Sequence, residues 1–118
     1  LLAAEKRSEM RGYLERLEEG SGARSRPFWS RRYFTADCGV LHQYESERQA
    51  SRRSTAATKK NLLPLVECKL TKVPVENKSR YEFVVEALSG RIQWRLAAQT
   101  EEERRKWLGA LSNCSSKS

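Results

Sequence analysis

The chain has 118 residues, which is long enough for one domain with a single modest core and too short for two. Lys and Arg number 23 against 15 Asp and Glu, and the net charge of +8 favours an anionic partner such as a membrane surface, a phosphorylated ligand or nucleic acid. Three cysteines without a CxxC pair and a single histidine support neither a disulfide framework nor a zinc site, and they indicate a reducing intracellular compartment. The sequence contains no apolar run long enough to span a membrane and no signal peptide.

Seven short segments alternate between apolar and polar residues, and turn residues separate them. Since alternate side chains of a strand share a face, Leu14 lies on the face of Arg16, and Phe34 lies on the face of Arg32. The apolar positions of these strands are expected to form the core. The predicted strands cover residues 10–17, 28–35, 40–44, 62–66, 68–73, 81–86 and 92–98.

Residues 45–61 form a polar stretch that has the pattern of neither a strand nor an apolar helix. Loops of this length in compact domains are usually functional or disordered. The stretch is expected to be exposed, and either to attract an anionic membrane weakly or to be a soluble insertion without a function. Its five basic residues, against two acids, are Arg48, Arg52, Arg53, Lys59 and Lys60.

Residues 100–114 are predicted to form an amphipathic helix. Thr100 is its expected N-cap, and Glu103 stands where a capping box needs an acid. Trp107 and Leu111 belong to one apolar stripe, which must lie against the strands. The helix is therefore expected to close one end of a β structure, with Trp107 as the buried plug. Basic side chains at helical spacing are expected to pair with the acids of the first turn, namely Arg104, Arg105 and Lys106.

Taken in order, the segments GYLER, FWSRRYF, GVLHQY, LPL, YEFVV and EEERRKWLGAL resemble a pleckstrin homology (PH) domain over residues 10–115. The resemblance implies a mainly β fold, in which two antiparallel sheets with seven strands form a partly open barrel that one C-terminal helix closes. It leaves residues 1–9 as a lead-in helix or linker and residues 116–118 as a tail. It also implies one module of a larger intracellular signalling or trafficking protein. The residues expected to hold the fold together are Leu14, Phe34, Trp107 and Leu111.

The same resemblance implies a site at the open end of the barrel. Family members that bind phosphoinositide headgroups tightly carry a basic residue at the end of the first strand and a basic-x-Arg pair in the second. Arg16 and Arg32 match the first and last of these positions, whereas Ser30 departs from the middle one. Gln43 stands where tight binders often carry Tyr. Further basic residues expected to contribute are Arg24, Arg26, Arg52, Arg53, Lys59 and Lys60.

Two functions remain open at this stage. Arg16 and Arg32 either bind phosphate or are solvated arginines at strand ends, and Glu18 and Glu19 are expected to repel a phosphorylated ring. The expected function is a non-catalytic membrane-targeting module, peripheral at the cytosolic face, which binds phosphoinositides or anionic lipid weakly to moderately and needs no cofactor. The alternative is a PH-like protein–protein interaction module with little lipid binding, and a nucleic-acid role ranks behind both. His42, on an outward strand face, lacks the partners of a catalytic base.

Overall fold

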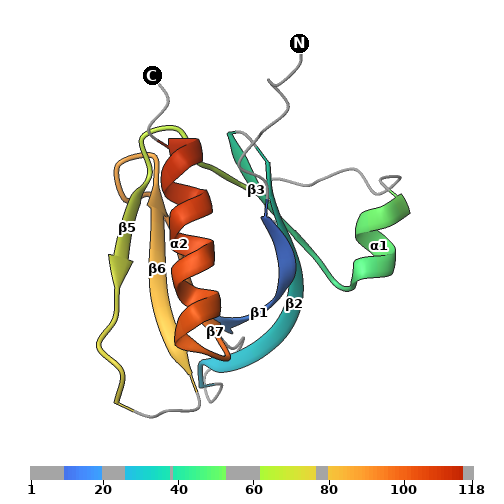
Figure 1. The fold of residues 1–118 in the computed structure, drawn as a ribbon, viewed down its shortest axis with the longest axis horizontal. Helices are drawn as coiled ribbons and strands as arrows, with labels where there is room; N and C mark the ends of the chain where they lie inside the picture. The colour runs from blue at the N-terminus through green and yellow to red at the C-terminus, as the bar shows by residue number, and fades with distance from the viewer. Residues whose placement is uncertain (1–9, 20–25, 38, 53–61, 77–79, 116–118) are drawn as a thin grey trace.

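The structure is a computed structural model, and it describes residues 10–19, 26–37, 39–52, 62–76 and 80–115. Seven strands precede a long C-terminal helix, and a short helix follows the third strand (Figure 1). The mainly β fold with one C-terminal helix is therefore confirmed. The elements are β1 (Met10–Glu18), β2 (Phe28–Asp37), β3 (Val40–Tyr44), α1 (Glu47–Arg52), β4 (Leu62–Pro64), β5 (Lys69–Lys72), β6 (Tyr81–Ala87), β7 (Ile92–Ala98) and α2 (Glu101–Ser115).

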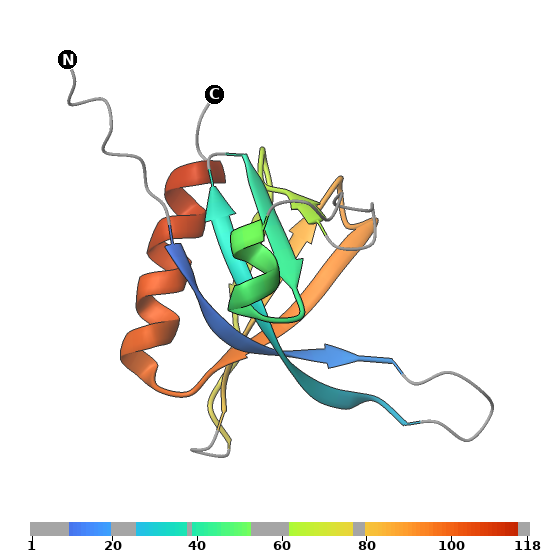
Figure 2. The ribbon, with the colours of Figure 1, turned by 90° about the vertical axis from the view of Figure 1, so that its right-hand side faces the viewer.

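All seven strands are hydrogen-bonded into one antiparallel sheet, in the order β4-β3-β2-β1-β7-β6-β5. β1 pairs with β2 along its whole length but with β7 only at Glu15 and Arg16. This short junction lets the two halves of the sheet bend toward each other over the core, and Figure 2 shows the curvature of β1 and β2. The two sheets expected from the sequence are thus joined through β1 into one. The sheet stays open, with β4 and β5 as its edges.

The core lies between the bent sheet and α2. Leu14, Phe34, Trp107 and Leu111 all belong to it, and each is at most 2% exposed. Trp107 packs over β1 at Gly12, where a Cβ atom would stand 3.8 Å from the indole ring. Inward side chains of the strands fill the rest of the core, because every second side chain of a strand points to the same face. The inward side chains of β6 and β7 include Phe83, Val85, Trp94 and Leu96.

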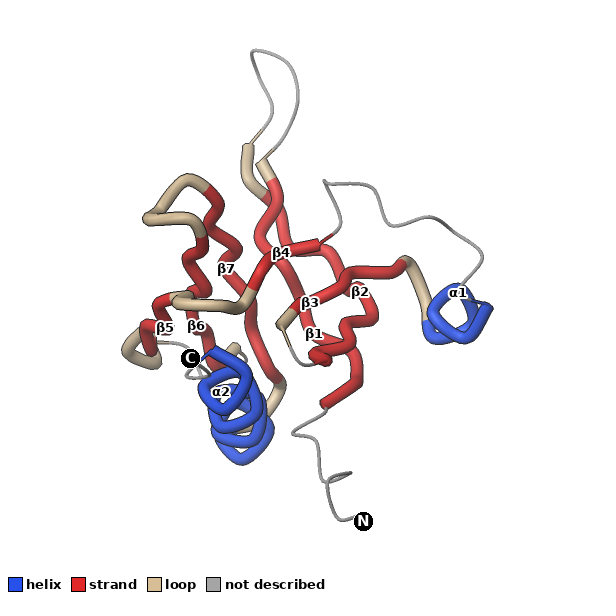
Figure 3. The backbone as a smooth tube through the Cα atoms, turned by 90° about the horizontal axis from the view of Figure 1, so that it is seen from above, coloured by secondary structure: helices blue, strands red, loops and turns tan. Residues whose placement is uncertain are grey.

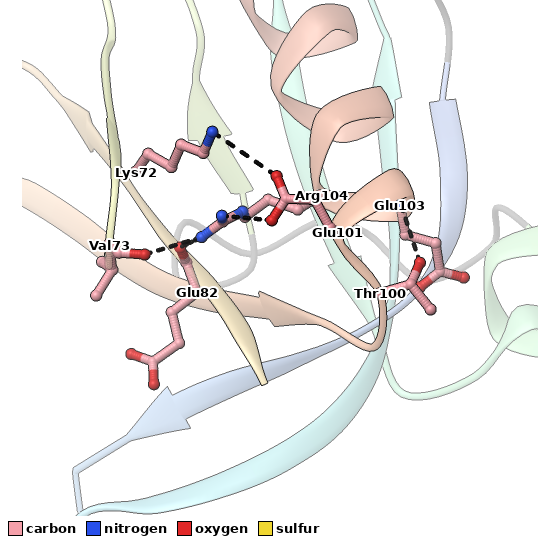
Figure 4. A network of polar contacts seen from close by, with 7 residues as sticks. All are labelled: Lys72, Val73, Glu82, Thr100, Glu101, Glu103 and Arg104. Atoms are coloured by element: carbon pink, nitrogen blue, oxygen red, sulfur yellow. Dashed lines mark hydrogen bonds and ion pairs between the residues drawn. The ribbon is translucent and has the colours of Figure 1, made fainter. Parts of the chain in front are cut away.

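Helix α2 begins with a reciprocal cap. The backbone N–H of Glu103 donates to the Thr100 hydroxyl oxygen at 3.1 Å (Figure 4). The Glu103 carboxylate in turn accepts from the backbone N–H of Gln99 at 3.3 Å, one residue before the cap. Free N–H groups at a helix start need such acceptors, and the acids of the first turn also suit the positive end of the helix dipole.

Arg104 is buried, which its place in the charged run ERRK does not predict. It pairs with Glu101 at 2.6 Å, as helical spacing predicts, but its side chain is only 3% exposed. Its Nη1 donates at 2.9 Å to the backbone carbonyls of Val73, just after β5, and of Glu82 on β6 (Figure 4). A buried guanidinium is tolerated only when acceptors replace its water. Arg104 therefore fastens the first turn of α2 to the strands.

Helix α1 occupies part of residues 45–61, which the sequence predicts to be an exposed loop without a strand or an apolar helix. Its start is capped locally, because the backbone N–H of Gln49 donates to the Ser46 hydroxyl and the Gln49 amide oxygen accepts from the backbone N–H of Glu45. The backbone N–H of Glu47 also donates to the Tyr13 hydroxyl on β1, at 3.1 Å. The helix is short and polar, and so it depends on these caps and on contact with β2 and β3 rather than on an apolar stripe.

Replacing Trp107 with Ala is expected to lower the free energy of unfolding by about 3 to 5 kcal/mol, because it empties the space between α2 and β1. Urea unfolding monitored by circular dichroism measures the change. Lys106→Ala, one residue earlier on the exposed face of α2, is the control and should change stability by less than about 0.5 kcal/mol. Equal stability of the two variants would contradict the plug role of Trp107.

Candidate functional site

A groove of about 790 Å³ opens where β1 ends and β7 begins. The strand ends that line it, from β1, β2 and β7, lie on the side of the molecule away from α2 (Figure 3). Side chains from β1, β2, β3 and β7 line it. The residues that matter most for its chemistry are Arg16, Glu18, Arg32, Gln43, Trp94 and Arg95.

Strand register explains why three polar side chains from different strands meet in this groove. Leu14 is paired with Arg32, and Phe34 is paired with Gln43, so both polar residues lie on the face that carries the core residues. Arg16 follows Leu14 by two residues and shares that face. The core residues thus determine which face of each strand points inward. The three polar residues lie on that inward face, where the strands reach the open end of the sheet.

Arg16 is held from two sides. Its Nη1 donates to the Gln43 amide oxygen at 2.7 Å, and its guanidinium carbon lies 4.4 Å from the centre of the Trp94 ring. Its Nε is buried and has no hydrogen-bond partner. Burial lowers the pKa of Arg16 from its ordinary value, with Arg32 acting in the same direction and Glu18 opposing both. The result is a partly desolvated cation whose terminal nitrogens carry more N–H donors than the single bond to Gln43 uses.

Arg32 already has an anionic partner. Its Nη2 lies 3.4 Å from a carboxylate oxygen of Glu18, and the two side chains are 33% and 25% exposed. The sequence predicts only repulsion of a phosphorylated ligand by Glu18 and Glu19. Both do line the groove, but Glu18 also neutralises Arg32. A phosphate that enters the groove must compete with this carboxylate.

Of the other basic residues expected at the site, only Arg26 and Arg52 lie in described segments, and Arg26 does not line the groove. Arg26 is an exposed residue between β1 and β2. Arg52 is the last residue of α1. The remaining predicted contacts, at Arg24, Arg53, Lys59 and Lys60, lie outside the described residues.

The contribution of β7 to the groove is not predicted by the sequence. Apolar alternation predicts Trp94 to be a core residue, whereas its indole also lines the groove and supports Arg16. Arg95 lines the groove as well, and it is paired with Glu82 at 2.6 Å. Gln43, read from the sequence as a departure from Tyr, accepts the hydrogen bond that orients Arg16. Only the cross-strand register reveals these roles.

Other kinds of site are not evident in the described part of the chain. No group of three or more His, Cys, Asp or Glu side chains there could hold a metal ion. None of the described helices is long and apolar enough to cross a membrane. His42 stacks on Tyr44, with ring centres 6.0 Å apart.

The family is decided by comparison with known sequences. A family model described as PH domain matches residues 8–116. The chain belongs to the PH domain family. PH domains are generally non-catalytic modules. A search of curated proteins finds no match for this PH domain.

Solved PH domains share the fold of this one. The PH domain of human oxysterol-binding protein-related protein 11 has 23% identity and a TM-score of 0.69, and the match covers 98% of this chain and 86% of that one. The C-terminal PH domain of pleckstrin, in complex with D-myo-Ins(1,2,3,4,5)P5, has 25% identity and a TM-score of 0.62, with 90% and 96% covered. The Slm1 PH domain, in complex with phosphoserine, has 23% identity and a TM-score of 0.67, with 93% and 98% covered.

Replacing Gln43 with Leu is expected to destabilise this PH domain by about 1 kcal/mol or more, because the half-buried Arg16 loses a hydrogen-bond acceptor. Chemical denaturation measures the change. Gln93→Leu is the matched control, since Gln93 lies in the same groove but bonds to Glu86 at an exposed position. If Gln93→Leu costs as much as Gln43→Leu, the Arg16 contact is not the cause.

Proposed function

We propose that this PH domain is a non-catalytic membrane-targeting module that binds phosphoinositides or anionic lipid, weakly to moderately, through its basic open end. The observation that carries the proposal is the pair of arginines, Arg16 and Arg32, on one wall of the groove. The domain would act as a peripheral module at the cytosolic face of a membrane. The complexes of related domains with an inositol phosphate and with phosphoserine support an anionic ligand.

Arg16 suits a phosphate for three physical reasons. Its guanidinium is planar and stays charged, so it can donate two parallel hydrogen bonds to phosphate oxygens. Trp94 and Gln43 hold the plane in one orientation, which reduces the entropy lost on binding. Burial has already removed part of its water, so an anion regains interaction energy that the free domain lacks.

The Glu18–Arg32 pair supports weak or moderate affinity rather than tight binding. A headgroup phosphate gains the attraction of Arg32 only by displacing or sharing Glu18, and it approaches a second carboxylate at Glu19. Long-range attraction from the net charge of +8 adds to binding, but salt screens it beyond about 10 Å. Stable attachment would then need a second membrane signal in the same protein.

Vesicle binding tests the proposal. The domain is mixed with vesicles of phosphatidylcholine alone, with phosphatidylserine, or with a multiply phosphorylated phosphoinositide, each at low and at physiological salt. Selective, salt-resistant binding to the phosphoinositide vesicles is expected. Binding to both anionic vesicles that salt abolishes would mean diffuse attraction without a headgroup site. Absence of binding to any vesicle would refute the membrane function and favour the protein-interaction module.

Arg32→Ala is expected to weaken binding to phosphoinositide vesicles about tenfold or more, because the groove loses a donor while Glu18 remains. Arg31→Ala is the matched control. It removes the same charge one residue away, on the opposite strand face, where Arg31 packs on Tyr13. Titration of vesicles at physiological salt compares the two variants. Equal losses would show that only the net charge matters.

Glu18→Gln is expected to tighten binding about threefold to tenfold, because Arg32 is released and one repulsive charge is removed. Calorimetric titration with a soluble inositol phosphate measures this effect without a membrane. Glu45→Gln removes an exposed acid beyond the end of β3 and provides the charge control. No gain from Glu18→Gln over this control would contradict the competition between Glu18 and phosphate.

A further inference from the structure

Two exposed aliphatic side chains stand at the same end of the β5–β6 pair. Val66, between β4 and β5, is 58% exposed, and Leu88, between β6 and β7, is 51% exposed. These are the two highest exposures among the large apolar side chains of the described residues. Because Lys69 is paired with Glu86, the residues just before β5 lie beside those just after β6. The two connections are neighbours in Figures 1 and 3.

The backbone of both connections is strained. Within the described ranges, the non-glycine residues with positive φ are Glu67 at 60°, Leu88 at 54° and Ser89 at 57°. Leu88 and Ser89 are the central residues of a turn that the hydrogen bond from Gly90 N–H to the Ala87 carbonyl closes at 3.1 Å. Positive φ at both central positions is typical of a type I′ turn, which strongly prefers Asn-Gly. An exposed Leu there is unfavourable both for the backbone and for solvation.

The strained turn borders the groove that holds Arg16. Ile92 and Gln93, at the start of β7, follow the turn and line that groove. Exposed charged side chains stand close to the two aliphatic ones in the sequence, basic at Lys69 and Arg91 and acidic at Glu67. The neighbourhood therefore combines the arginines of the groove, two basic neighbours and apolar tips, which suits the anionic headgroup layer with hydrocarbon beneath it.

We infer that Val66 and Leu88 form an apolar contact surface that enters the interfacial layer of the membrane while the Arg16 groove takes a headgroup. The inference rests on the proposed function and adds a second, salt-insensitive contribution to it. Asn in place of Leu88 would relieve the backbone strain of the turn and would not expose an apolar side chain to water. The strain and the exposure of Leu88 are both explained if the side chain leaves water at the membrane.

Leu88→Asn tests the inference, since stability and binding should move in opposite directions. The melting temperature is expected to rise, because Asn accepts positive φ more readily than Leu. Affinity for phosphoinositide vesicles is expected to fall about fivefold to tenfold, at low and at high salt alike, because an apolar contact is lost. Binding of a soluble inositol phosphate should not change. A purely structural role of Leu88 would not produce this combination.

Val75→Asn is the matched control. Val75 is also an exposed aliphatic residue, 39% exposed, but it follows β5 and so lies at the other end of the β5–β6 pair. Its replacement should leave vesicle affinity unchanged. In the unmodified domain bound to vesicles, nitroxide groups on the lipid acyl chains should broaden the methyl NMR signals of Leu88 and Val66 and spare those of Val75.

The outcomes separate this inference from the proposed function. Unchanged vesicle affinity of Leu88→Asn and Val66→Ser, with a loss for Arg32→Ala, would overturn the membrane contact and leave the headgroup site standing. Equal losses of vesicle and soluble-ligand binding in Leu88→Asn would also overturn it, because the turn would then act on the groove. Failure of the unmodified domain to bind vesicles would refute both proposals. Binding of a protein partner through Leu88 would then identify the exposed aliphatic residues as a protein-binding surface.

Discussion

Strand β1 is the element on which the rest of the structure depends. It pairs with β2 along its whole length and joins β7 through Glu15 and Arg16, so it connects the two halves of the sheet. Its alternating side chains supply both faces: Leu14 enters the core, Arg16 enters the groove, and Tyr13 faces outward to hold the start of α1. A shift of one residue would exchange these faces and remove core and groove together.

Two arginines show how the same side chain acquires different roles from its surroundings. Arg104 is buried, and its terminal nitrogens donate to two backbone carbonyls and to Glu101. Arg16 has one amide acceptor and the face of Trp94, and it borders an open groove. Donors already committed to the protein stabilise the fold, and donors that face solvent are available to a ligand. Residue type alone does not distinguish the two cases.

The sequence predicts the strands, the C-terminal helix and the shared face of Arg16 and Arg32, because alternation and capping are local properties. It does not predict α1, whose first turn relies on the Tyr13 hydroxyl 34 residues away. The burial of Arg104 depends on carbonyls 22 and 31 residues distant, and the Glu18–Arg32 pair depends on cross-strand register. The burial of Arg104 and the Glu18–Arg32 pair are contacts between distant segments, for which a single sequence carries no periodic signal, whereas the cap of α1 by Ser46 and Gln49 is local.

An open sheet leaves two strand edges without partners, and exposed edges can pair with those of another molecule and aggregate. In this domain both edges are short. β4 has three residues and ends in Pro64, which has no N–H to offer, and β5 has four residues, with Lys69 and Lys72 at its ends. Like charges on β5 would meet if two copies aligned there. Many copies could therefore be crowded together and remain separate folded units.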